Sequence, residues 1–499
     1  MLSRSDALEM LAGRRFDLLV VGAGIVGSRV AYEAAQSGLS VALVDAGDFG
    51  GATSSASSKL VHGGLRYLGS GDLRLVRESQ TEKSALLRLA PGLVHRLPFM
   101  MAIYRHGQIG SRQMRAGLML YGTLSGFREV WASELSPAAA AARVPGLRTE
   151  DLEAGWLYEE GQTNDGRLTL ATVKGAAEAG AVVLNHAAVV ELGSDEAVVE
   201  APEGRVGVGF RAAVNASGPW VDHVRRLEDP GCVPLVRLSK GVHLLLPLPA
   251  GFDTAVSIPL GGTRATFAVP WEGMLLLGTT DTGYEGDAAA ARVEPADVDM
   301  VLGEAALMLG EDVVRRDLIR HTYAGLRALP AGPGETARAS REHFVNVGPQ
   351  GLVSIAGGKL TTHRRIAIDV LRELPERVRP RGLRPSNRPL PGFAHPPQGR
   401  RPADVEPASW SHLIDHYGSE VDRLLAYGAH DPEALGPIAA GGPDVWAQAC
   451  HAVENEWAVT AEDVLRRRTT VSIRGLGTPE VEARVDRLLA GGPGLSQHG

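Results

Sequence analysis

Residues 16–45 read FDLLVVGAGIVGSRVAYEAAQSGLSVALVD, and this stretch decides the fold. Its first six residues form a short apolar run, which is typical of a strand buried on both faces. A helix is predicted over residues 25–36, and it ends near Gly38, a natural residue for a helix C-terminus. A second apolar run follows over residues 40–44. The pattern predicts a βαβ unit of about 30 residues.

Three glycines at the first strand-to-helix turn form a G-x-G-x-x-G motif. Gly22 permits the tight turn, Gly24 lets a pyrophosphate approach the backbone, and Gly27 lets the helix pack closely on the strand. Asp45, at the end of the second strand, is placed to accept hydrogen bonds from ribose hydroxyls, and its charge would repel a 2′-phosphate. The unit therefore predicts a dinucleotide site, but it does not separate NAD from FAD.

Length, net charge and cysteine content exclude several classes of protein. The chain has 499 residues, long enough for about two or three domains. Its net charge of -7 argues against a nucleic-acid partner. The two cysteines, Cys232 and Cys450, are far apart, so they provide neither metal-ligand spacing nor a dithiol beside the glycine motif. We expect no metal, and any redox chemistry to reside on the cofactor.

Neither a leader peptide nor a membrane span is predicted. Five of the first 15 residues are charged, which leaves no long uncharged core, and no apolar run reaches the roughly 18 residues that a membrane span needs. The cytoplasm is therefore the expected compartment. Residues 112–124 are predicted to form a short apolar helix with arginines at one end. It either packs into the core or lies on a membrane surface, with Met119, Leu120 and Tyr121 dipping inward.

A hydroxyl-rich segment follows the βαβ unit and reads ATSSASSKLVHGGLRYL over residues 52–68. Such composition is common in flexible linkers, but the hydroxyls are also good donors to phosphate and ribityl oxygens. Both interpretations stay open from the residues alone. Later in the chain, Ser217-Gly218 follows a predicted strand, as expected where a doubly wound sheet returns to its nucleotide. Gly357-Gly358 precedes a predicted helix, and this turn is either an ordinary connection or places a helix N-terminus where it would stabilise the anion of a reduced flavin.

Basic residues recur at predicted strand ends and turns. Together they would suit an anionic substrate, because guanidinium groups match phosphate or carboxylate oxygens in pairs. These positions are Arg66 with Tyr67, Lys240 with His243, Arg327, Arg341 and Lys359.

These motifs resemble one family over nearly the whole chain. The sequence is similar to the FAD-dependent glycerol-3-phosphate dehydrogenases, among the flavoproteins that resemble D-amino-acid oxidase. The matching stretches are VVGAGIVG (20–27), ATSSASSKLVHGGLRYL (52–68), NASGPW (215–220), KGVH (240–243), GTTD (278–281), YAGLR (323–327) and GGKLTTHR (357–364).

The resemblance implies an α/β fold with three parts. A glutathione-reductase-like FAD domain spans residues 1–385 and contains a discontinuous substrate domain with an antiparallel sheet, at roughly 70–150 and 225–345. A Pro- and Arg-rich linker follows at 386–406, and an all-α cap domain occupies 407–499. Noncovalent FAD is the expected cofactor.

The resemblance also implies oxidation of sn-glycerol 3-phosphate to dihydroxyacetone phosphate by hydride transfer to the flavin. His243, Arg327 and Lys359 would be catalytic, and Arg66, Tyr67 and Arg341 would bind the substrate phosphate. The proton acceptor is either His243 or a water molecule held by Arg327. The expected cofactor contacts are Gly22, Gly24, Gly27, Asp45, Thr53, Ser54, Ser55, Ser57, Ser58, Lys59, His62, Gly63, Gly64, Ser217, Gly218, Gly357, Gly358, Lys359, Leu360 and Thr361.

Three positions depart from the family pattern. Ala328 follows Arg327 where the family usually has proline, Gly166 replaces an alanine between Asp165 and Arg167, and Phe393 replaces a glycine after the linker. The first change puts the exact position of Arg327, and with it the substrate preference, in question.

The resemblance implies a membrane quinone as electron acceptor and peripheral association with the cytoplasmic face of the inner membrane. An oxidase of the same fold that uses O₂, on this or another small substrate, is the first alternative. A flavin-binding sensor or scaffold without turnover is the second. A homodimer is also compatible with the sequence.

Overall fold

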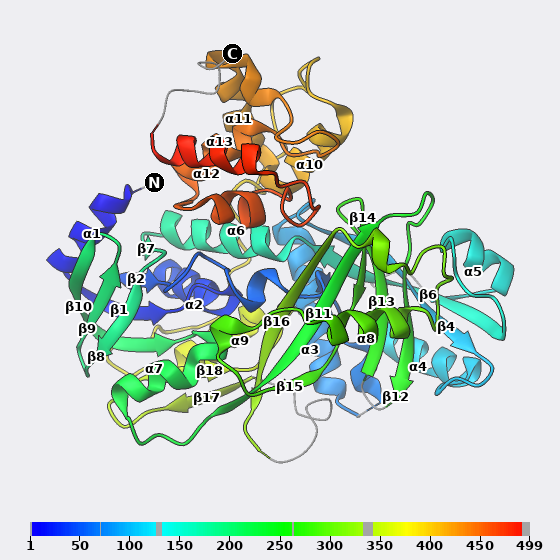
Figure 1. Ribbon diagram of the computed structural model, residues 1–499. Coiled ribbons are helices and arrows are strands. Elements are labelled where there is room, and N and C mark those ends of the chain that lie inside the picture. The colour runs from blue at the N-terminus through cyan, green and yellow to red at the C-terminus, as the bar shows by residue number, and fades with distance from the viewer. Residues whose placement is uncertain (1, 70, 126–131, 262–263, 333–342, 492–499) are drawn as a thin grey trace.

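The computed structural model describes residues 2–69, 71–125, 132–261, 264–332 and 343–491. Arg341 lies outside these ranges, and the side chain of Arg66 is not among those described. Two β-sheets lie side by side, and a group of C-terminal helices covers one end of both (Figure 1). The predicted α/β class with a helical C-terminal region is confirmed.

The first sheet is organised around β1 (Arg15–Val21), the strand that precedes the glycine motif. It pairs in parallel with β2 (Val41–Val44) and with β10 (Gly204–Asn215), so the predicted βαβ unit is correct. The outer strands of this sheet are β7 (Val182–Leu184), β18 (Val353–Ala356), β17 (Phe344–Val347), β9 (Glu196–Ala201) and β8 (Ala188–Leu192).

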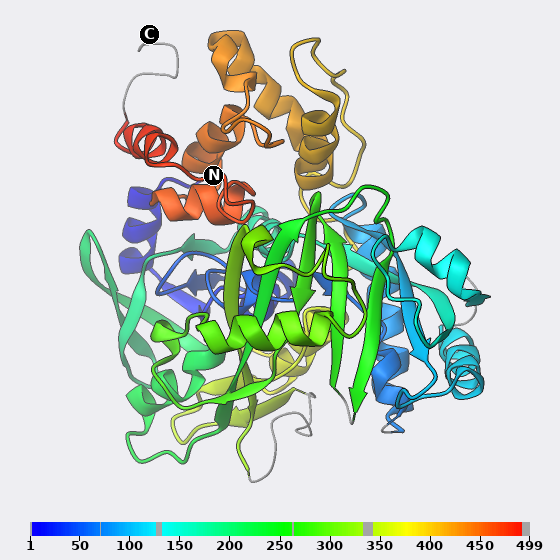
Figure 2. The same cartoon turned by 45° about the vertical axis from the view of Figure 1, so that its right-hand side comes forward.

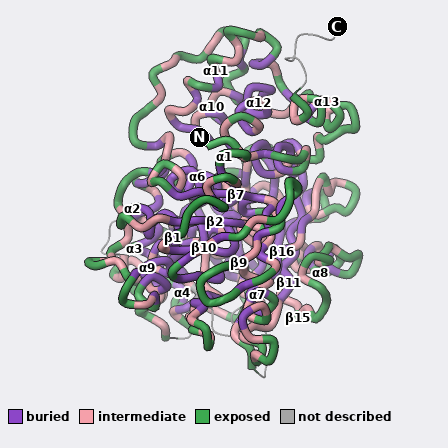
Figure 3. Tube along the Cα trace, turned by 90° about the vertical axis from the view of Figure 1, so that its left-hand side faces the viewer, coloured by how far each residue is buried: buried purple, intermediate pink, exposed green. Residues whose placement is uncertain are grey.

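Alternate side chains of β1 enter two separate hydrophobic cores. Leu18 faces one core and Leu19 the other, and both are fully buried. Helices cover both faces, which explains the continuous apolar run in the sequence. On the first face lie α2 (Ile25–Gln36), α6 (Asp165–Glu178) and α9 (His363–Arg372), and on the second α1 (Arg4–Gly13) and α7 (Val221–Glu228). Figure 3 shows these strands as largely buried, and the covering helices α2 and α6 are largely buried as well.

The second sheet is mostly antiparallel, as expected for a substrate domain. Its strand β6 lies beyond the expected boundary near residue 150 and pairs along the full length of β4. In order, the sheet contains β15 (Thr282–Tyr284), β11 (Val236–Pro247), β14 (Met274–Gly278), β13 (Arg264–Trp271), β12 (Ala255–Gly261), β4 (Val94–Tyr104), β6 (Leu152–Thr163) and β3 (Leu60–Val61), with β16 (His321–Pro330) beside β11 and β5 (Ser133–Leu135) beside β6.

Helices also cover parts of the second sheet. On one face, α8 (Pro295–Ala305) packs against the even-numbered residues of β11, such as Val242 and Leu244. On the other face lie α3 (Leu73–Leu89) and α4 (Ser111–Leu124), and α5 (Pro137–Arg143) contacts β6. An apolar core therefore fills the space between α8 and the sheet. The odd-numbered residues of β11 point to the opposite face of the sheet, where the candidate active site lies.

Helix α4 bears on the two interpretations of residues 112–124. Met114, Leu118 and Tyr121 are buried, and the Tyr121 hydroxyl donates to Glu160 at 2.6 Å. Packing into the core is therefore correct for this face, and Tyr121 is not available to a membrane surface. Met119 and Leu120 are exposed, at 63% and 41% of their surface.

The C-terminal helices lie above the two sheets (Figure 2). Between α9 and α10 the chain forms neither helix nor strand, as expected for the linker. Among the described residues, no helix has both the length and the apolar composition that crossing a membrane requires. The helices of this region are α10 (Pro407–Tyr417), α11 (Val421–His430), α12 (Trp446–Asn455) and α13 (Pro479–Leu489), with a π-helical turn at Asp463–Arg468.

Candidate active site

The glycine turn leaves no room for side chains. A Cβ on Gly22, which has a φ of +98°, would lie 2.7 Å from the carbonyl oxygen of Ala216 at the end of β10. A Cβ on Gly27 would lie 1.8 Å from the carbonyl oxygen of Gly22. Gly24 caps α2, and the Ser54 hydroxyl accepts the Ile25 amide at 2.9 Å. The cradle and the helix N-terminus suit the pyrophosphate of a dinucleotide.

Asp45 closes this turn from the side of β2. Its carboxylate accepts the amides of Ala23 at 2.6 Å and Gly47 at 2.9 Å. Burial raises the pKa of Asp45 to about 6, although both amides favour the charged form. The carboxylate therefore orders the backbone of the glycine turn, and its bond to a ribose stays a prediction.

Ser217 and Gly218 lie beside the same turn. Ser217 donates its hydroxyl to Asn215 at 2.6 Å, and its Cα is 2.8 Å from the position that a Cβ on Gly22 would take. Gly218 has a φ of +57° and begins the short turn that leads into α7. The structure thus brings these two sequence-predicted residues next to the glycine motif.

The hydroxyl-rich segment is a fixed loop. Thr53 donates to the Leu326 carbonyl at 2.7 Å, and Ser57 donates to Asp165 at 2.7 Å. The Ser58 hydroxyl is hydrogen-bonded to His243 Nε2 at 2.9 Å. Side-chain bonds to β16, α6 and β11 thereby hold the loop between the two sheets, so the linker interpretation is wrong. Ser55 is buried beside these residues.

A buried ion pair beneath this loop escaped the sequence analysis. Lys59 donates to Asp165 at 2.5 Å and to the Ser55 carbonyl at 2.7 Å, and both charged side chains are almost fully buried. Burial lowers the pKa of Lys59 to about 8, although Asp165 favours the charged form. Lys59 was expected to contact the cofactor. Here its ammonium group ties the loop to the first turn of α6.

His243 lies on β11 in a wholly buried position. Its ring stacks on Tyr323 of β16, with ring centroids 4.9 Å apart, and Ser58 bonds to Nε2. Its Nδ1 is buried without a hydrogen-bond partner in the described part of the chain. Burial, with Arg327 and Lys59 nearby, lowers the pKa of His243 well below its ordinary value. The imidazole is therefore neutral at physiological pH.

Arg327 projects from β16 onto the same face of the sheet. Its guanidinium donates to the Thr279 hydroxyl at 2.9 Å and to the Thr280 carbonyl at 3.1 Å. A Cβ on Gly241 would lie 2.3 Å from Arg327 Nη2, so the glycine provides the space that the guanidinium occupies. Lys240 points to the opposite face, where it pairs with Asp297 of α8 at 2.7 Å. Of the two basic residues in KGVH, only His243 therefore reaches the site.

Lys359 joins the site from the turn before α9. Its ammonium nitrogen lies 3.7 Å from the centroid of the Tyr67 ring. The turn is built on Gly357 and Gly358, with φ values of +76° and +87°. A Cβ on Gly358 would lie 2.4 Å from the Ile366 side chain. The two glycines thus let the chain fold back close to α9.

The segment around His62 contacts the same turn. The His62 amide donates to the Thr361 hydroxyl at 3.1 Å, and the Gly63 amide donates to Glu160 at 2.8 Å. Gly64 has a φ of +85°. Leu360 accepts a hydrogen bond from the His363 ring at its carbonyl oxygen. These contacts bring residues 62–67 and 357–361 together, which the sequence alone does not show.

The C-terminal region adds a cation that the sequence analysis missed. Arg466 donates to the Ser55 carbonyl at 3.1 Å, and its guanidinium lies 5.5 Å from the centroid of the Tyr323 ring. Ser55 is 411 residues away from Arg466 in the chain, and no local pattern marks this contact. The cap region therefore contacts the hydroxyl loop directly.

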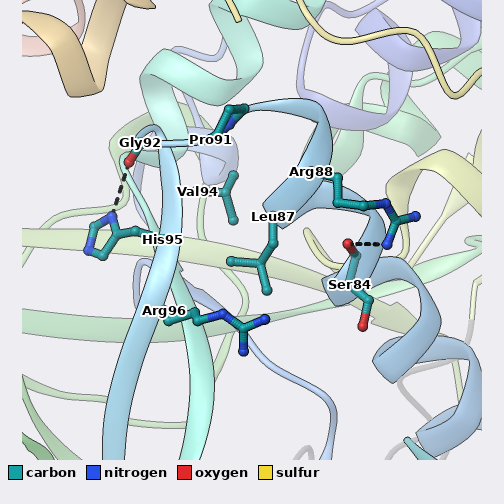
Figure 4. Close-up of a pocket in the computed structure, with 8 residues that line it drawn as sticks. All are labelled: Ser84, Leu87, Arg88, Pro91, Gly92, Val94, His95 and Arg96. Carbon is teal, nitrogen blue, oxygen red and sulfur yellow. Dashed lines mark hydrogen bonds between the residues drawn. The ribbon is translucent and has the colours of Figure 1, made fainter. Parts of the chain in front are cut away.

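A separate surface hollow of about 360 Å³ lies where α3 ends and β4 begins (Figure 4). Arg88 and His95 there donate to nearby backbone carbonyls, and Arg96 pairs with Glu159. The hollow includes none of the sequence-predicted site residues.

Comparison with known proteins gives a consistent result. Residues 17–364 match the family model of the FAD dependent oxidoreductases, and residues 356–496 match that of the C-terminal domain of alpha-glycerophosphate oxidase. Glycerol-3-phosphate dehydrogenase 2 of Mycobacterium tuberculosis is 36% identical, over 94% of this chain and 83% of that protein. The mitochondrial glycerol-3-phosphate dehydrogenase of Mus musculus is 32% identical, over 93% and 68%.

Solved structures agree with these matches. The glycerol-3-phosphate dehydrogenase of Bacillus halodurans, complexed with FAD, superposes with a TM-score of 0.73 at 26% identity, over 98% of this chain and 96% of that one. The L-alpha-glycerophosphate oxidase of Mycoplasma pneumoniae shares the fold, with a TM-score of 0.57 at 15% identity.

Proposed function

Since this chain belongs to the FAD-dependent oxidoreductases and, among them, to the glycerol-3-phosphate dehydrogenases, we propose that it oxidises sn-glycerol 3-phosphate to dihydroxyacetone phosphate. The C2 carbon gives up a hydride and its hydroxyl gives up a proton. Bound FAD supplies the hydride acceptor, at flavin N5. Gly22, Gly24 and Gly27 hold the pyrophosphate, and the cradle that a Cβ would fill supports this assignment.

The observation that carries this proposal is the environment of His243. A buried, neutral imidazole, one of whose nitrogens has no hydrogen-bond partner among the described residues, lies beside a guanidinium on the same sheet face. Buried polar atoms are normally hydrogen-bonded, so the exception at Nδ1 needs a reason. A role in proton transfer to or from the substrate would provide it. We assign His243 the proton of the C2 hydroxyl, through Nδ1, while Ser58 holds Nε2.

Arg327 is the electrostatic partner in this scheme. Because a guanidinium group keeps its proton near neutral pH, Arg327 acts by stabilising the negative charge that develops on the C2 oxygen. A histidine whose pKa is lowered is a weak base. Stabilisation of the charge on the C2 oxygen by Arg327 is therefore needed for the proton to leave. A water molecule held by Arg327 is the second possible proton acceptor.

The substrate phosphate is assigned to Arg66, Tyr67, Arg341 and Lys359. Support comes from the contact of the Lys359 ammonium with the Tyr67 ring, which places one cation beside the segment that carries Arg66. Guanidinium and ammonium groups bind a phosphate dianion more strongly than a neutral alcohol. We therefore propose that glycerol itself is a poor substrate.

For the electron acceptor we propose a membrane quinone, reached by peripheral contact with the membrane. Helix α4 supports this, because Arg112 and Arg115 are exposed in its first half and Met119 and Leu120 are exposed just past its middle. Basic residues near lipid phosphates and apolar ones below them are typical of interfacial helices. Flotation with anionic vesicles tests this, and binding unchanged in a Met119→Ser, Leu120→Ser double variant would exclude α4.

Anaerobic titration of the flavin tests the reaction itself. Glycerol 3-phosphate is expected to bleach the flavin absorbance, whereas glycerol and a D-amino acid leave it unchanged. A flavin that stays oxidised with glycerol 3-phosphate would contradict the proposal and favour a non-catalytic flavoprotein. Rapid oxygen uptake by the reduced protein without quinone would instead assign it to the oxidases, which the matched C-terminal family model also names.

A further inference from the structure

Three polar side chains meet where the second sheet touches the C-terminal helices. Glu272 lies at the tip of the β13–β14 hairpin, and His412 and His416 lie one turn apart on α10. Glu272 Oε1 is 2.7 Å from His416 Nε2, and Glu272 Oε2 is 3.3 Å from His412 Nδ1. Both imidazoles are almost fully buried, with ring centroids 4.0 Å apart.

A second carboxylate fixes the outer side of His412. Its Nε2 lies 2.9 Å from Asp444 Oδ1, and Asp444 in turn accepts the amide of Thr470 at 3.0 Å and its hydroxyl at 2.6 Å. A carboxylate behind a histidine is the arrangement that orients metal-binding imidazoles in proteins. Because Asp444 is already held by Thr470, it serves as this outer partner.

The hydrogen-bond chemistry of His412 is unusual. Carboxylate oxygens only accept hydrogen bonds, and each ring nitrogen of His412 faces one, Nδ1 towards Glu272 and Nε2 towards Asp444. A cation between Nδ1 and Glu272 would bind both of these atoms, and Nε2–H would then donate to Asp444.

Two other carboxylate–histidine clusters in the described residues are of a different kind. In one, Asp48 is bonded by the guanidinium groups of Arg467 and Arg468. In the other, Glu456 is bonded by Arg167. Those carboxylates already have their cations. At Glu272, the guanidinium of Arg474 stays 3.7 Å from Oε2, longer than a hydrogen bond.

We propose that Glu272, His412 and His416 bind one divalent transition-metal ion, zinc being the best match, with water in the fourth position. Two imidazole nitrogens and one carboxylate oxygen form a donor set typical of zinc. One ligand atom from each of the three residues lies within 4.8 Å of the other two, which is close enough for a single ion to reach all three after small side-chain movements. The ion joins the sheet hairpin to the cap helices.

The test uses the FAD-loaded protein, stripped with a chelator, equilibrated with zinc alone and passed through a desalting column. We expect about one zinc ion per chain by elemental analysis, and a thermal unfolding midpoint that rises with zinc. Glu272→Gln and His416→Gln should lose both effects. Asp444→Asn should bind zinc about 10–100-fold more weakly. Glu482→Gln, a change of the same kind at an exposed position on α13, should behave like the unmodified chain.

Flavin content and far-ultraviolet circular dichroism identify variants that fail to fold. Glu272→Gln keeps the size of the side chain at a hairpin tip, so it provides the decisive comparison if His416→Gln misfolds. The proposal is overturned if the unmodified chain retains no zinc. It is equally overturned if folded Glu272→Gln retains as much zinc as the unmodified chain, because the ion would then be bound without this carboxylate.

Discussion

Arg167 binds both carboxylate oxygens of Glu456, at 2.7 and 3.0 Å, although 289 residues separate them in the chain. Arg167 comes from α6 of the first-sheet region, and Glu456 directly follows α12 of the C-terminal helices. Both side chains are buried, and the guanidinium also lies 4.1 Å from the centroid of the Tyr417 ring. This pair joins the two parts of the molecule.

We expect Glu456→Gln to destabilise the docked C-terminal helices, because it leaves Arg167 charged and buried without its partner. Breaking such a pair costs about 3–5 kcal/mol. The measurement is chemical unfolding of the FAD-loaded protein. Asp317→Asn, which removes an exposed partner of Arg315, is the control and should leave unfolding unchanged. Equal stability of the two variants would show that the buried pair does not stabilise the contact between the C-terminal helices and the first-sheet region.

Gly27→Ala should abolish FAD binding without preventing folding of the second sheet. The added Cβ would lie 1.8 Å from the Gly22 carbonyl oxygen, so the glycine turn and α2 must move apart. Flavin released on denaturation, per mole of purified chain, measures the effect. Gly303→Ala in α8, where a Cβ meets nothing within 4 Å, is the matched control and should retain full flavin content. A yellow Gly27→Ala protein would contradict the assignment.

Gly241→Ala should displace the Arg327 guanidinium, because the Cβ would lie 2.3 Å from Nη2. A misplacement of about 1 Å can lower the rate about 10²-fold, so kcat/KM for glycerol 3-phosphate should fall by about that factor while flavin content stays normal. Steady-state kinetics with an artificial electron acceptor provide the measurement. Gly283→Ala on β15, with nothing within 4 Å, is the control. Normal kcat/KM in Gly241→Ala would remove Arg327 from the mechanism.

His243→Ala should lower kcat by about 10²–10⁴-fold, the usual contribution of a positioned general base. Flavin content should change little, since the glycine turn lies elsewhere. His223→Ala, an exposed histidine on α7, serves as the control. Because the pKa of His243 is held well below its ordinary value, kcat/KM should show no loss centred near pH 6.5. Unchanged turnover in His243→Ala would leave the water held by Arg327 as the proton acceptor.

His363 should make the fold less stable as the pH falls. Burial, with Arg29 nearby, lowers the pKa of His363 to about 3, against about 6.5 in an unfolded chain. Between these values only the unfolded chain binds the proton, so the free energy of unfolding falls by about 1.4 kcal/mol per pH unit from this residue. From pH 7 to pH 5 the loss is about 2 kcal/mol.

Chemical unfolding at the two pH values checks this expectation. The pH-dependent loss should be smaller by that amount in His363→Gln, which cannot take up the proton. His321 and His451, whose pKa values burial lowers to about 4, act in the same direction and remain in the variant. An identical pH dependence in the variant and the unmodified chain would contradict the prediction.

Local patterns explain which parts of the fold were predictable. The β1–α2–β2 unit follows from apolar runs and three glycines within about 30 residues, since strand, turn and helix preferences act over short distances. The contact between Thr460 and Asp463 is equally local: the side chain of each accepts the backbone amide of the other, as in a capping box. The boundary near residue 150 had no comparable signal, and β6 lies beyond it.

By itself, the sequence determined the dinucleotide fold, the FAD-dependent class and the positions of His243, Arg327 and Lys359 as candidates. Only the tertiary structure decided that Lys240 faces α8, that Lys59 pairs with Asp165, and that Glu272 meets His412 and His416. The physical reason is distance along the chain. The residues of a motif lie close together in the chain, so their spacing can be recognised in the sequence. These contacts join residues that are far apart in the chain and that only packing and strand alternation bring together.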